Sequence, residues 1–249
     1  PELESSRLAA QIEREYAAQR QQTPTGQPGV LPVFVGRLRE RAHLIAALDN
    51  AIAGQGGMCI VLAEAGMGRS ALLQELEHSA RWRGAQIVWG RGDGDRLPQP
   101  FAPLREALRA ALPEARTQQL EEFVRAPWRA AVRQLLADAE VNSEPPSPAR
   151  NPEELALAVG STLTALGRIV PYLILLDDMQ WADRSLWQLL DALRQPLAQS
   201  RVLLVLSCRL EEAQNEAAVR DRLTAWEQAG DSTVQQLAGL SESELGDML

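Results

Sequence analysis

The segment that most constrains the fold is residues 57–70, GMCIVLAEAGMGRS, in which an apolar run passes directly into two glycines. Residues 58–63 are mostly apolar and include two β-branched side chains, so they predict a short buried strand. Gly66 and Gly68 follow at once, and the residues after them have the spacing of an amphipathic helix. The segment therefore predicts a strand, a glycine-rich turn and a helix in immediate succession.

This arrangement is typical of a loop that binds phosphate. Glycine lets the backbone turn sharply and bring its N–H groups close to an anion with no Cβ in the way, and the N-terminal end of the next helix adds positive partial charge. Against the phosphate-loop pattern G-x-x-x-x-G-K-[ST], the sequence agrees at Gly68 and Ser70 and departs at Ala63 and Arg69. The departure at Arg69 matters more, because lysine is expected there.

Two adjacent acids form a second candidate site. Asp177 and Asp178 follow residues 172–176, a continuous apolar run that predicts a parallel strand covered on both faces. In a phosphate-loop fold the acid at such a strand end holds Mg²⁺, and a following acid can polarise the attacking water. Exposed carboxylates at a strand end are the alternative, but the apolar run and the upstream loop favour the metal site.

Strand and helix patterns alternate along most of the chain. Further strands are predicted at 85–90, 202–209 and 232–237. Helical spacing is found at about 70–83, 153–168, 184–194 and 211–228, with two more stretches within 115–140. A helix before the loop is expected to turn Leu44, Ile45, Leu48 and Ile52 inward. The alternation predicts an α/β fold with a mainly parallel five-stranded sheet.

Composition divides the chain into four parts. Residues 1–20 have helical spacing and predict an N-terminal helix, interpreted as the end of a preceding domain. Residues 21–32 are rich in Pro, Gly and Gln and predict a linker to a domain at 33–240, within which residues 141–152 predict a mobile surface loop. Residues 241–249 open with a capping box and predict the start of a truncated helical domain. Since no initiator methionine is present, we expect a longer polypeptide.

Charge and cysteine usage exclude several classes of function. The net charge of −8 argues against direct nucleic-acid binding by this segment, because phosphate neutralisation needs a basic face. No apolar run approaches the roughly 18–20 residues of a membrane span, and no signal-peptide pattern is present. Cys59 and Cys208 lie in apolar stretches and are predicted to be buried free thiols, which indicates a cytoplasmic protein.

Four segments, in this order and spacing, resemble the nucleotide-binding core of STAND-type ATPases. They are FVGRLRE at 34–40, AEAGMGRS at 63–70, LILLDDMQWAD at 173–183 and LSCR at 206–209. Proteins of this AAA-related group are regulatory NTPases found in large bacterial transcriptional regulators with DNA-binding domains of the LuxR or antibiotic-regulator (SARP) type. The resemblance covers about 32–249 and implies a P-loop NTPase fold, a three-layer sandwich around the parallel sheet.

The resemblance also implies roles for individual residues. The implied nucleotide contacts are Val35, Gly36 and Arg37 beside the adenine and ribose, and Ala65, Gly66, Met67, Gly68, Arg69, Ser70 and Ala71 around the phosphates. Ser70 and Asp177 would hold Mg²⁺, and Asp178 would act with Arg69 in catalysis. Arg209 would sense the γ-phosphate, although a solvated arginine at a strand end is the alternative for it.

The arginine at position 69 decides how much activity can be expected. All 25 basic residues of the chain are arginine, so Arg69 fits a chain-wide preference and does not by itself mark a dead loop. Arginine keeps the charge of lysine but spreads it over a wider planar fork, so it cannot occupy the same point. Backbone N–H groups still bind phosphate, whereas a misplaced transition-state contact typically costs on the order of 10²–10³ in rate. We therefore predict nucleotide binding with weak or absent hydrolysis.

The function that follows is an ATP- or ADP-binding regulatory switch. The resemblance implies that ADP holds a closed state, that ATP permits rearrangement or self-association, and that the partners are other domains of the same polypeptide. One alternative is an ATPase with true turnover. The other is a degenerate scaffold that binds no nucleotide, but such a scaffold has no physical need for Ser70, Asp177 and Asp178 together.

Overall fold

The computed structural model describes residues 36–94, 99–137, 152–230 and 232–239, all within one compact unit of the chain, residues 34–249. Several sequence predictions lie outside the described residues: the helix at 1–20, the linker at 21–32, Val35, residues 141–151 of the predicted loop, and the segment 241–249.

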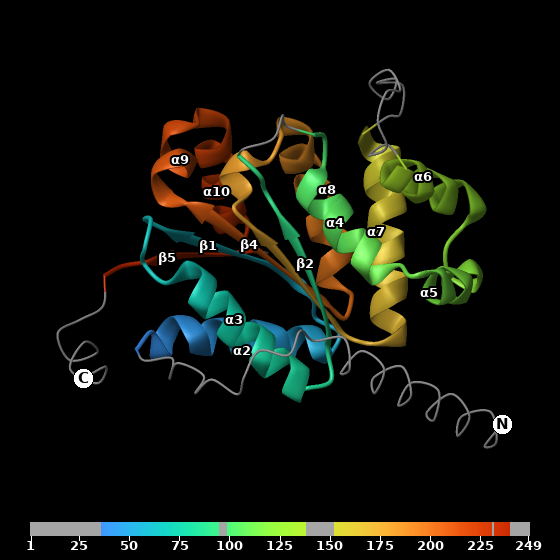
Figure 1. Ribbon diagram of the computed structural model, residues 1–249, viewed down its shortest axis with the longest axis horizontal. Coiled ribbons are helices and arrows are strands. Elements are labelled where there is room, and N and C mark those ends of the chain that lie inside the picture. The colour runs from blue at the N-terminus through green and yellow to red at the C-terminus, as the bar shows by residue number, and fades with distance from the viewer. Residues whose placement is uncertain (1–35, 95–98, 138–151, 231, 240–249) are drawn as a thin grey trace. The chain divides into compact units, whose positions relative to one another are not determined.

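Five parallel strands form a single sheet in the order β2-β3-β4-β1-β5. The strands are β1 (Gly57–Ala63), β2 (Gln86–Arg91), β3 (Tyr172–Asp177), β4 (Val202–Arg209) and β5 (Ser232–Leu237). All five strands predicted from the sequence are confirmed. Because the strands run the same way, the carboxyl ends of β1, β3 and β4 lie along one edge of the sheet (Figure 1).

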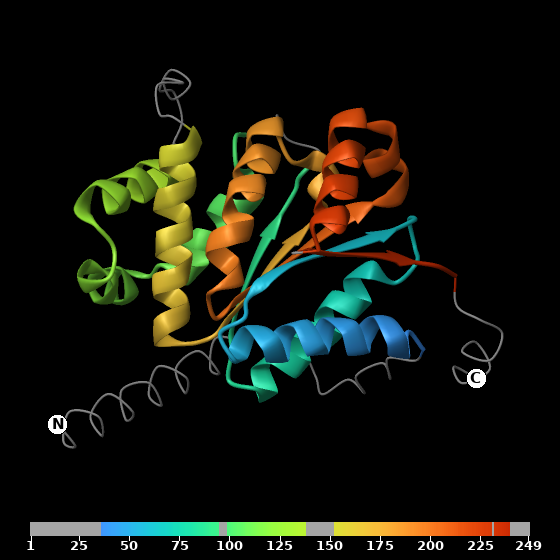
Figure 2. The same ribbon diagram turned by 180° about the vertical axis from the view of Figure 1, so that it is seen from behind.

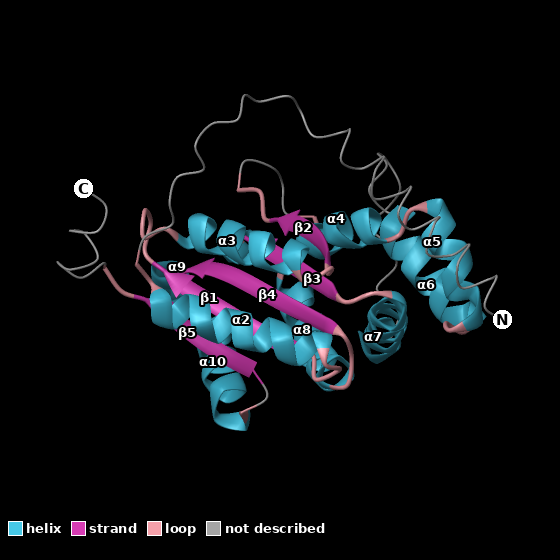
Figure 3. Cartoon of the chain, turned by 90° about the horizontal axis from the view of Figure 1, so that it is seen from below, coloured by secondary structure: helices cyan, strands magenta, loops and turns pink. Residues whose placement is uncertain are grey.

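Helices cover both faces of the sheet, as Figures 1 and 2 show from opposite sides. One face carries α2 (Leu38–Ile52) and α3 (Arg69–Trp82), which lie in front of the strands in Figure 3. The other face carries α4 (Ala102–Ala111), α7 (Pro152–Ile169), α8 (Arg184–Ala198), α9 (Leu210–Asn215) and α10 (Ala217–Ala229). Beside α7 lie α5 (Glu114–Gln119), the short 3₁₀ helix η1 (Leu120–Glu122) and α6 (Ala126–Ala137). The predicted three-layer sandwich is confirmed.

Strand β3, which lies between β2 and β4, shows why its sequence is apolar at every position before its final aspartate. Leu173 and Leu175 pack on the side of α2 and α3, while Tyr172, Ile174 and Leu176 pack on the opposite side. All five side chains are buried. A parallel strand with a helical layer on each face has no polar side, so an alternating pattern would expose charge to one of the two cores.

Two details of the helix predictions need correction. The predicted helix at 211–228 is two helices, α9 and α10, because the backbone at Glu216 is extended. Apolar spacing does not register a break of one residue. In α2, Leu44 and Leu48 are buried as predicted, whereas Ile45 and Ile52 are only partly buried at the edge of the same core. Within the described part of the chain, no helix is long and apolar enough to cross a membrane.

Both cysteines are free and buried, as the sequence predicts. Burial raises the pKa of the Cys59 thiol to about 12 and that of the Cys208 thiol to about 12, from the model-compound value of 9.0. The charged thiolate is disfavoured in both cases because it would lose its hydration.

We expect neither thiol to react with a maleimide or a disulfide reagent in the native protein at pH 8. At four pH units below the pKa only about one thiol in 10⁴ is ionised, and the surrounding core excludes the reagent. Both thiols should react after denaturation, and this reaction gives the total number of free thiols as a control. Rapid labelling of the native protein, followed by mass spectrometry, would show that one of the strands is exposed.

A second prediction concerns Gly90, in β2, which α4 approaches closely. A Cβ at Gly90 would lie 1.8 Å from the carbonyl oxygen of Pro103, so an alanine forces backbone to move. We expect Gly90→Ala to lower the free energy of unfolding by about 1–3 kcal/mol or more. The matched control is Gly57→Ala in β1, where a Cβ meets nothing within 4 Å. Equal losses in urea unfolding of the two variants would contradict this packing.

Candidate functional site

The predicted phosphate loop lies at the edge of the sheet where β1 ends. Ala63 is the last residue of β1, and α3 begins at Arg69, so the loop has only five residues between them. Gly66 and Gly68 have positive φ angles of 80° and 77°, a left-handed conformation that glycine adopts without strain. The loop is also open, since Ala65, Gly66 and the first-turn residue Ser70 are exposed.

The two acids stand at the end of β3, on the same edge. Asp177 is the last residue of the strand and is 1% exposed. Asp178 turns the chain into the 3₁₀ helix η2 (Met179–Trp181) with a φ of 56°, a conformation that aspartate tolerates better than most residues. The turn leaves the Asp178 side chain 27% exposed. The Asp177 side chain is therefore buried, whereas the Asp178 side chain is partly exposed and contacts Arg69, the residue that follows the glycine loop.

An ion pair joins the loop to both acids. Nη2 of Arg69 donates to Oδ1 of Asp178 at 2.6 Å, and Nε of Arg69 lies 3.7 Å from Oδ1 of Asp177. The Arg69 side chain is only 12% exposed, so water screens this interaction weakly. The sequence predicts Arg69 beside the phosphates. Its guanidinium lies on the two carboxylates, and a phosphate contact stays a prediction.

The buried carboxylate of Asp177 has three further partners. The hydroxyl of Ser207, which is 0% exposed in β4, donates to Oδ1 of Asp177. The backbone N–H of Asp178 donates to the same oxygen at 3.0 Å, and Nη2 of Arg91 lies 3.7 Å from the other oxygen. These contacts compensate the loss of hydration of a buried charge. Ser207 lies within the LSCR segment, in which only Arg209 has a predicted role.

A glutamine that the sequence analysis also left without a role links the acids to β4. Gln180 in η2 donates from Nε2 to Oδ1 of Asp178 at 3.0 Å and accepts, at Oε1, the backbone N–H of Arg209 at 3.2 Å. The Arg209 guanidinium is 42% exposed and pairs with Glu212 at 3.4 Å. Arg209 therefore lies on the predicted edge, and its proposed contact with a γ-phosphate stays a prediction.

Arg37 holds the loop from the other side. It is 5% exposed, has a positive φ of 54° and follows Gly36, the first described residue. Its Nη2 donates to the carbonyl oxygens of Met67, at 2.6 Å, and Ala238, at 2.9 Å. The sequence places Arg37 beside the adenine and ribose. The structure shows it tying the phosphate loop to the end of β5, which fixes the shape of the loop.

The residues present fit an anion better than a divalent cation. Among the described residues, Nε and Nη1 of Arg69 are buried and have no hydrogen-bond partner, so a shift of the side chain would offer these donors to an acceptor such as a phosphate oxygen. The carboxylates that would hold Mg²⁺ are already engaged by Arg69. In the described ranges no group of three or more His, Cys, Asp or Glu side chains could hold a metal ion.

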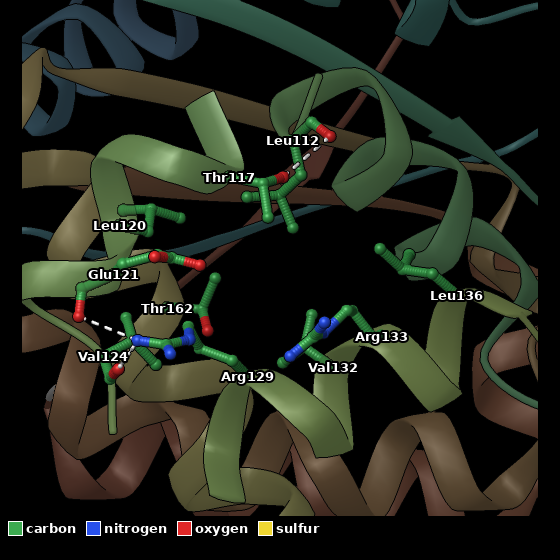
Figure 4. Close-up of a pocket in the computed structure, with 10 residues that line it drawn as sticks. All are labelled: Leu112, Thr117, Leu120, Glu121, Val124, Arg129, Val132, Arg133, Leu136 and Thr162. Carbon is green, nitrogen blue, oxygen red and sulfur yellow. Dashed lines mark hydrogen bonds between the residues drawn. The ribbon is translucent and has the colours of Figure 1, made fainter. Parts of the chain in front are cut away.

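A separate hollow lies among the helices of the opposite layer (Figure 4). Its volume is about 60 Å³, and its walls come mostly from α5, α6 and η1. Arg129 closes one side by donating to the carbonyl oxygens of Glu121 and Val124 at 2.8 and 3.0 Å. A space of this size holds about two water molecules. None of the predicted site residues lines it, so it is a packing gap and not the nucleotide site.

Comparison with known proteins identifies the type of domain. The family model of the AAA ATPase domain matches residues 33–206, and together with the parallel sheet this match supports the predicted P-loop NTPase fold. No curated protein matches the chain.

Solved structures that are similar to the chain include the following two. One is PCH-2 from C. elegans, with 12% identity and a TM-score of 0.38, over 82% of this chain and 43% of that one. The other is a Signal Transduction ATPase with Numerous Domains (STAND) protein with a tetratricopeptide repeat sensor from Pyrococcus horikoshii, with 15% identity and a TM-score of 0.42, over 91% of this chain and 27% of that one. The chain thus spans less than half the length of either. Neither similarity is close enough to carry an argument about function.

The role of Ser207 can be tested by removing its hydroxyl. Ser207→Ala leaves the buried Asp177 carboxylate with one donor fewer, and a hydrogen bond to a charged group contributes about 1.5–3 kcal/mol. We expect the free energy of unfolding in urea to fall by about that amount. The control is Ser185→Ala on the surface of α8, where a change below about 0.5 kcal/mol is expected. An unchanged stability for Ser207→Ala would contradict the hydrogen bond.

Proposed function

The chain belongs to the AAA ATPase domain family, and from that premise we propose that it is an ATP- or ADP-binding switch module of a larger signalling or transcriptional regulator. The observation that carries the proposal is the open glycine loop between β1 and α3, set beside the acids that end β3. Three charged residues meet there: Arg69, Asp177 and Asp178. We also propose that the module acts on further domains of the same polypeptide, in the cytoplasm of a bacterium.

Phosphate binding would rely on the backbone. The N–H groups of residues 65–70 and the N-terminal end of α3 would hold the β-phosphate. Arg37 supports this role because it fixes the loop through the carbonyl oxygen of Met67. Glycines at 66 and 68 leave the approach to these N–H groups free of Cβ atoms. Gly36, which precedes Arg37, would lie near the nucleoside.

The same contacts support the proposal of weak hydrolysis. Oδ1 of Asp178 already accepts hydrogen bonds from Arg69 and Gln180, at 2.6 and 3.0 Å. An acid that polarises the attacking water must be oriented toward it, and these two hydrogen bonds fix the orientation of the Asp178 carboxylate. Arg69, in turn, is held by the acids and is not a compact charge between β- and γ-phosphates. Binding without rapid turnover suits a switch, in which the nucleotide state and not the product carries the signal.

Communication with neighbouring domains would run through two links. Arg37 connects the loop to Ala238 at the end of β5, and Gln180 connects Asp178 to the end of β4. A shift of the loop on nucleotide exchange would therefore change the positions of Ala238, just after β5, and of Arg209, at the end of β4. Rearrangement of later domains, or self-association, would be the output.

The test is a calorimetric titration of the purified chain with ADP and with ATP. We expect saturable binding of one nucleotide per chain. Gly66→Ala should weaken it by about tenfold or more, because a Cβ then stands in the anion's approach. The matched control is Gly84→Ala, at the far end of α3. Its φ of 74° is close to the 80° of Gly66, and neither position has a neighbour within 4 Å, so the backbone strain is alike.

The alternatives give different results. Absence of binding to the folded chain would contradict the switch and favour a scaffold that uses no nucleotide. Steady phosphate release that Asp178→Asn abolishes would instead favour an ATPase with true turnover.

A further inference from the structure

We propose that this site binds the phosphates of a nucleoside diphosphate without a divalent cation, with the Arg69 guanidinium in the place that the metal ion takes in related loops. The inference rests on the proposed nucleotide site and specifies the charge state of its ligand. It starts from one juxtaposition: the side chain at the lysine position of the loop lies on both acids at the end of β3.

Arg69 and a metal ion would compete for the same carboxylate oxygen atoms of Asp177 and Asp178. In phosphate-loop NTPases Mg²⁺ is bound by the loop Ser or Thr and by an acid at a strand end, which here would be Ser70 and Asp177. Mg²⁺ requires near-octahedral oxygen ligands at about 2.0–2.1 Å. Oδ1 of Asp178 accepts Nη2 of Arg69 at 2.6 Å, and Oδ1 of Asp177 has Nε of Arg69 at 3.7 Å. A guanidinium in this position occupies the space that the ion and its water ligands would need.

Both oxygens of Asp177 already have partners, so this carboxylate is a poor ligand for a metal ion. Ser207 and the backbone N–H of Asp178 both donate to its Oδ1, and Arg91 lies 3.7 Å from its Oδ2. The residue is 1% exposed. Turning this carboxylate toward Ser70 would break contacts that compensate a buried charge, which is strongly unfavourable.

The shape of the arginine side chain lets Arg69 contact the acids and a phosphate together. Guanidinium is a planar fork with five N–H donors, so it can hold a carboxylate with one nitrogen and a phosphate oxygen with another. Nη2 of Arg69 donates to Asp178, whereas Nε and Nη1 have no hydrogen-bond partner in the part of the chain that the structure describes. Lysine has one ammonium on a slim stem, so it would reach the phosphates and leave the acids to the metal ion. The exchange of lysine for arginine therefore changes how the site uses cations.

The charges of the side chains around the two acids also favour binding of phosphate without a metal ion. The two carboxylates face two guanidinium groups, those of Arg69 and Arg91, so these four side chains together carry no net charge. Arg91 is 65% exposed and can follow an incoming phosphate. A diphosphate then meets fixed positive charge, backbone N–H groups and a helix N-terminus, all supplied by the protein.

The test compares ADP affinity in excess EDTA with that in excess Mg²⁺, by calorimetry, for three proteins. For the unsubstituted chain we expect the Kd to differ by less than about twofold between the buffers. Arg69→Lys should bind about tenfold more tightly with Mg²⁺ than with EDTA, since the acids are then free for the ion. Arg81→Lys, the same exchange on the exposed far turn of α3, should behave as the unsubstituted chain.

Each other outcome has a definite meaning. Loss of affinity by about tenfold in EDTA for the unsubstituted chain would overturn the inference and leave the nucleotide site standing. An Arg69→Lys variant that also ignores Mg²⁺ would overturn the assignment to Arg69. No binding by the folded chain in either buffer would overturn both the inference and the proposed function.

A second measurement does not depend on the lysine variant. Mn²⁺ is titrated into the unsubstituted chain without nucleotide, and free Mn²⁺ is followed by electron paramagnetic resonance. We expect the free signal to match that of a protein-free titration. A stoichiometric loss of signal that Asp177→Asn abolishes would overturn the inference.

Discussion

The ion pair between Arg69 and the two acids is the interaction on which this edge of the sheet depends. It joins the first residue of α3 to the end of β3, and its partners are mostly shielded from water. A charge buried this far is tolerated only when it is paired, and removal of Arg69 would leave two neighbouring carboxylates without the cation that they share. The pair therefore holds the start of α3 against the end of β3 and, at the same time, engages one oxygen of each acid that a metal ion could use.

The surrounding contacts give this pair a fixed frame. Ser207 orients Asp177 from the neighbouring strand, and Gln180 orients Asp178 while also holding the end of β4. On the far side, Arg37 holds the loop carbonyl of Met67. Two of these residues, Arg37 and Asp178, have left-handed backbone conformations. Such conformations persist where surrounding structure enforces them, and they are frequent at functional sites.

Local patterns in the sequence predict the strands, the loop and the acids well, because each depends on neighbouring residues. Glycines at 66 and 68 imply the turn that the structure contains, and the apolar run before Asp177 implies a strand with two covered faces. Ser207 and Gln180 could not be assigned from the sequence, since their roles depend on which strands are adjacent and in what register. The pairing of Leu176 with Leu206 brings Ser207 beside Asp177. Likewise, the destination of the Arg69 side chain depends on two strands that are far apart in the sequence.

A double-mutant cycle tests the central interaction most directly. The free energy of unfolding is measured in urea for the unsubstituted chain, Arg69→Gln, Asp178→Asn and the double variant, without nucleotide or metal ion. A partly buried ion pair predicts that the two changes are non-additive, with a coupling energy of about 1–3 kcal/mol. Additivity to within about 0.5 kcal/mol would show that Arg69 and Asp178 do not interact in solution, and would contradict this account of the site.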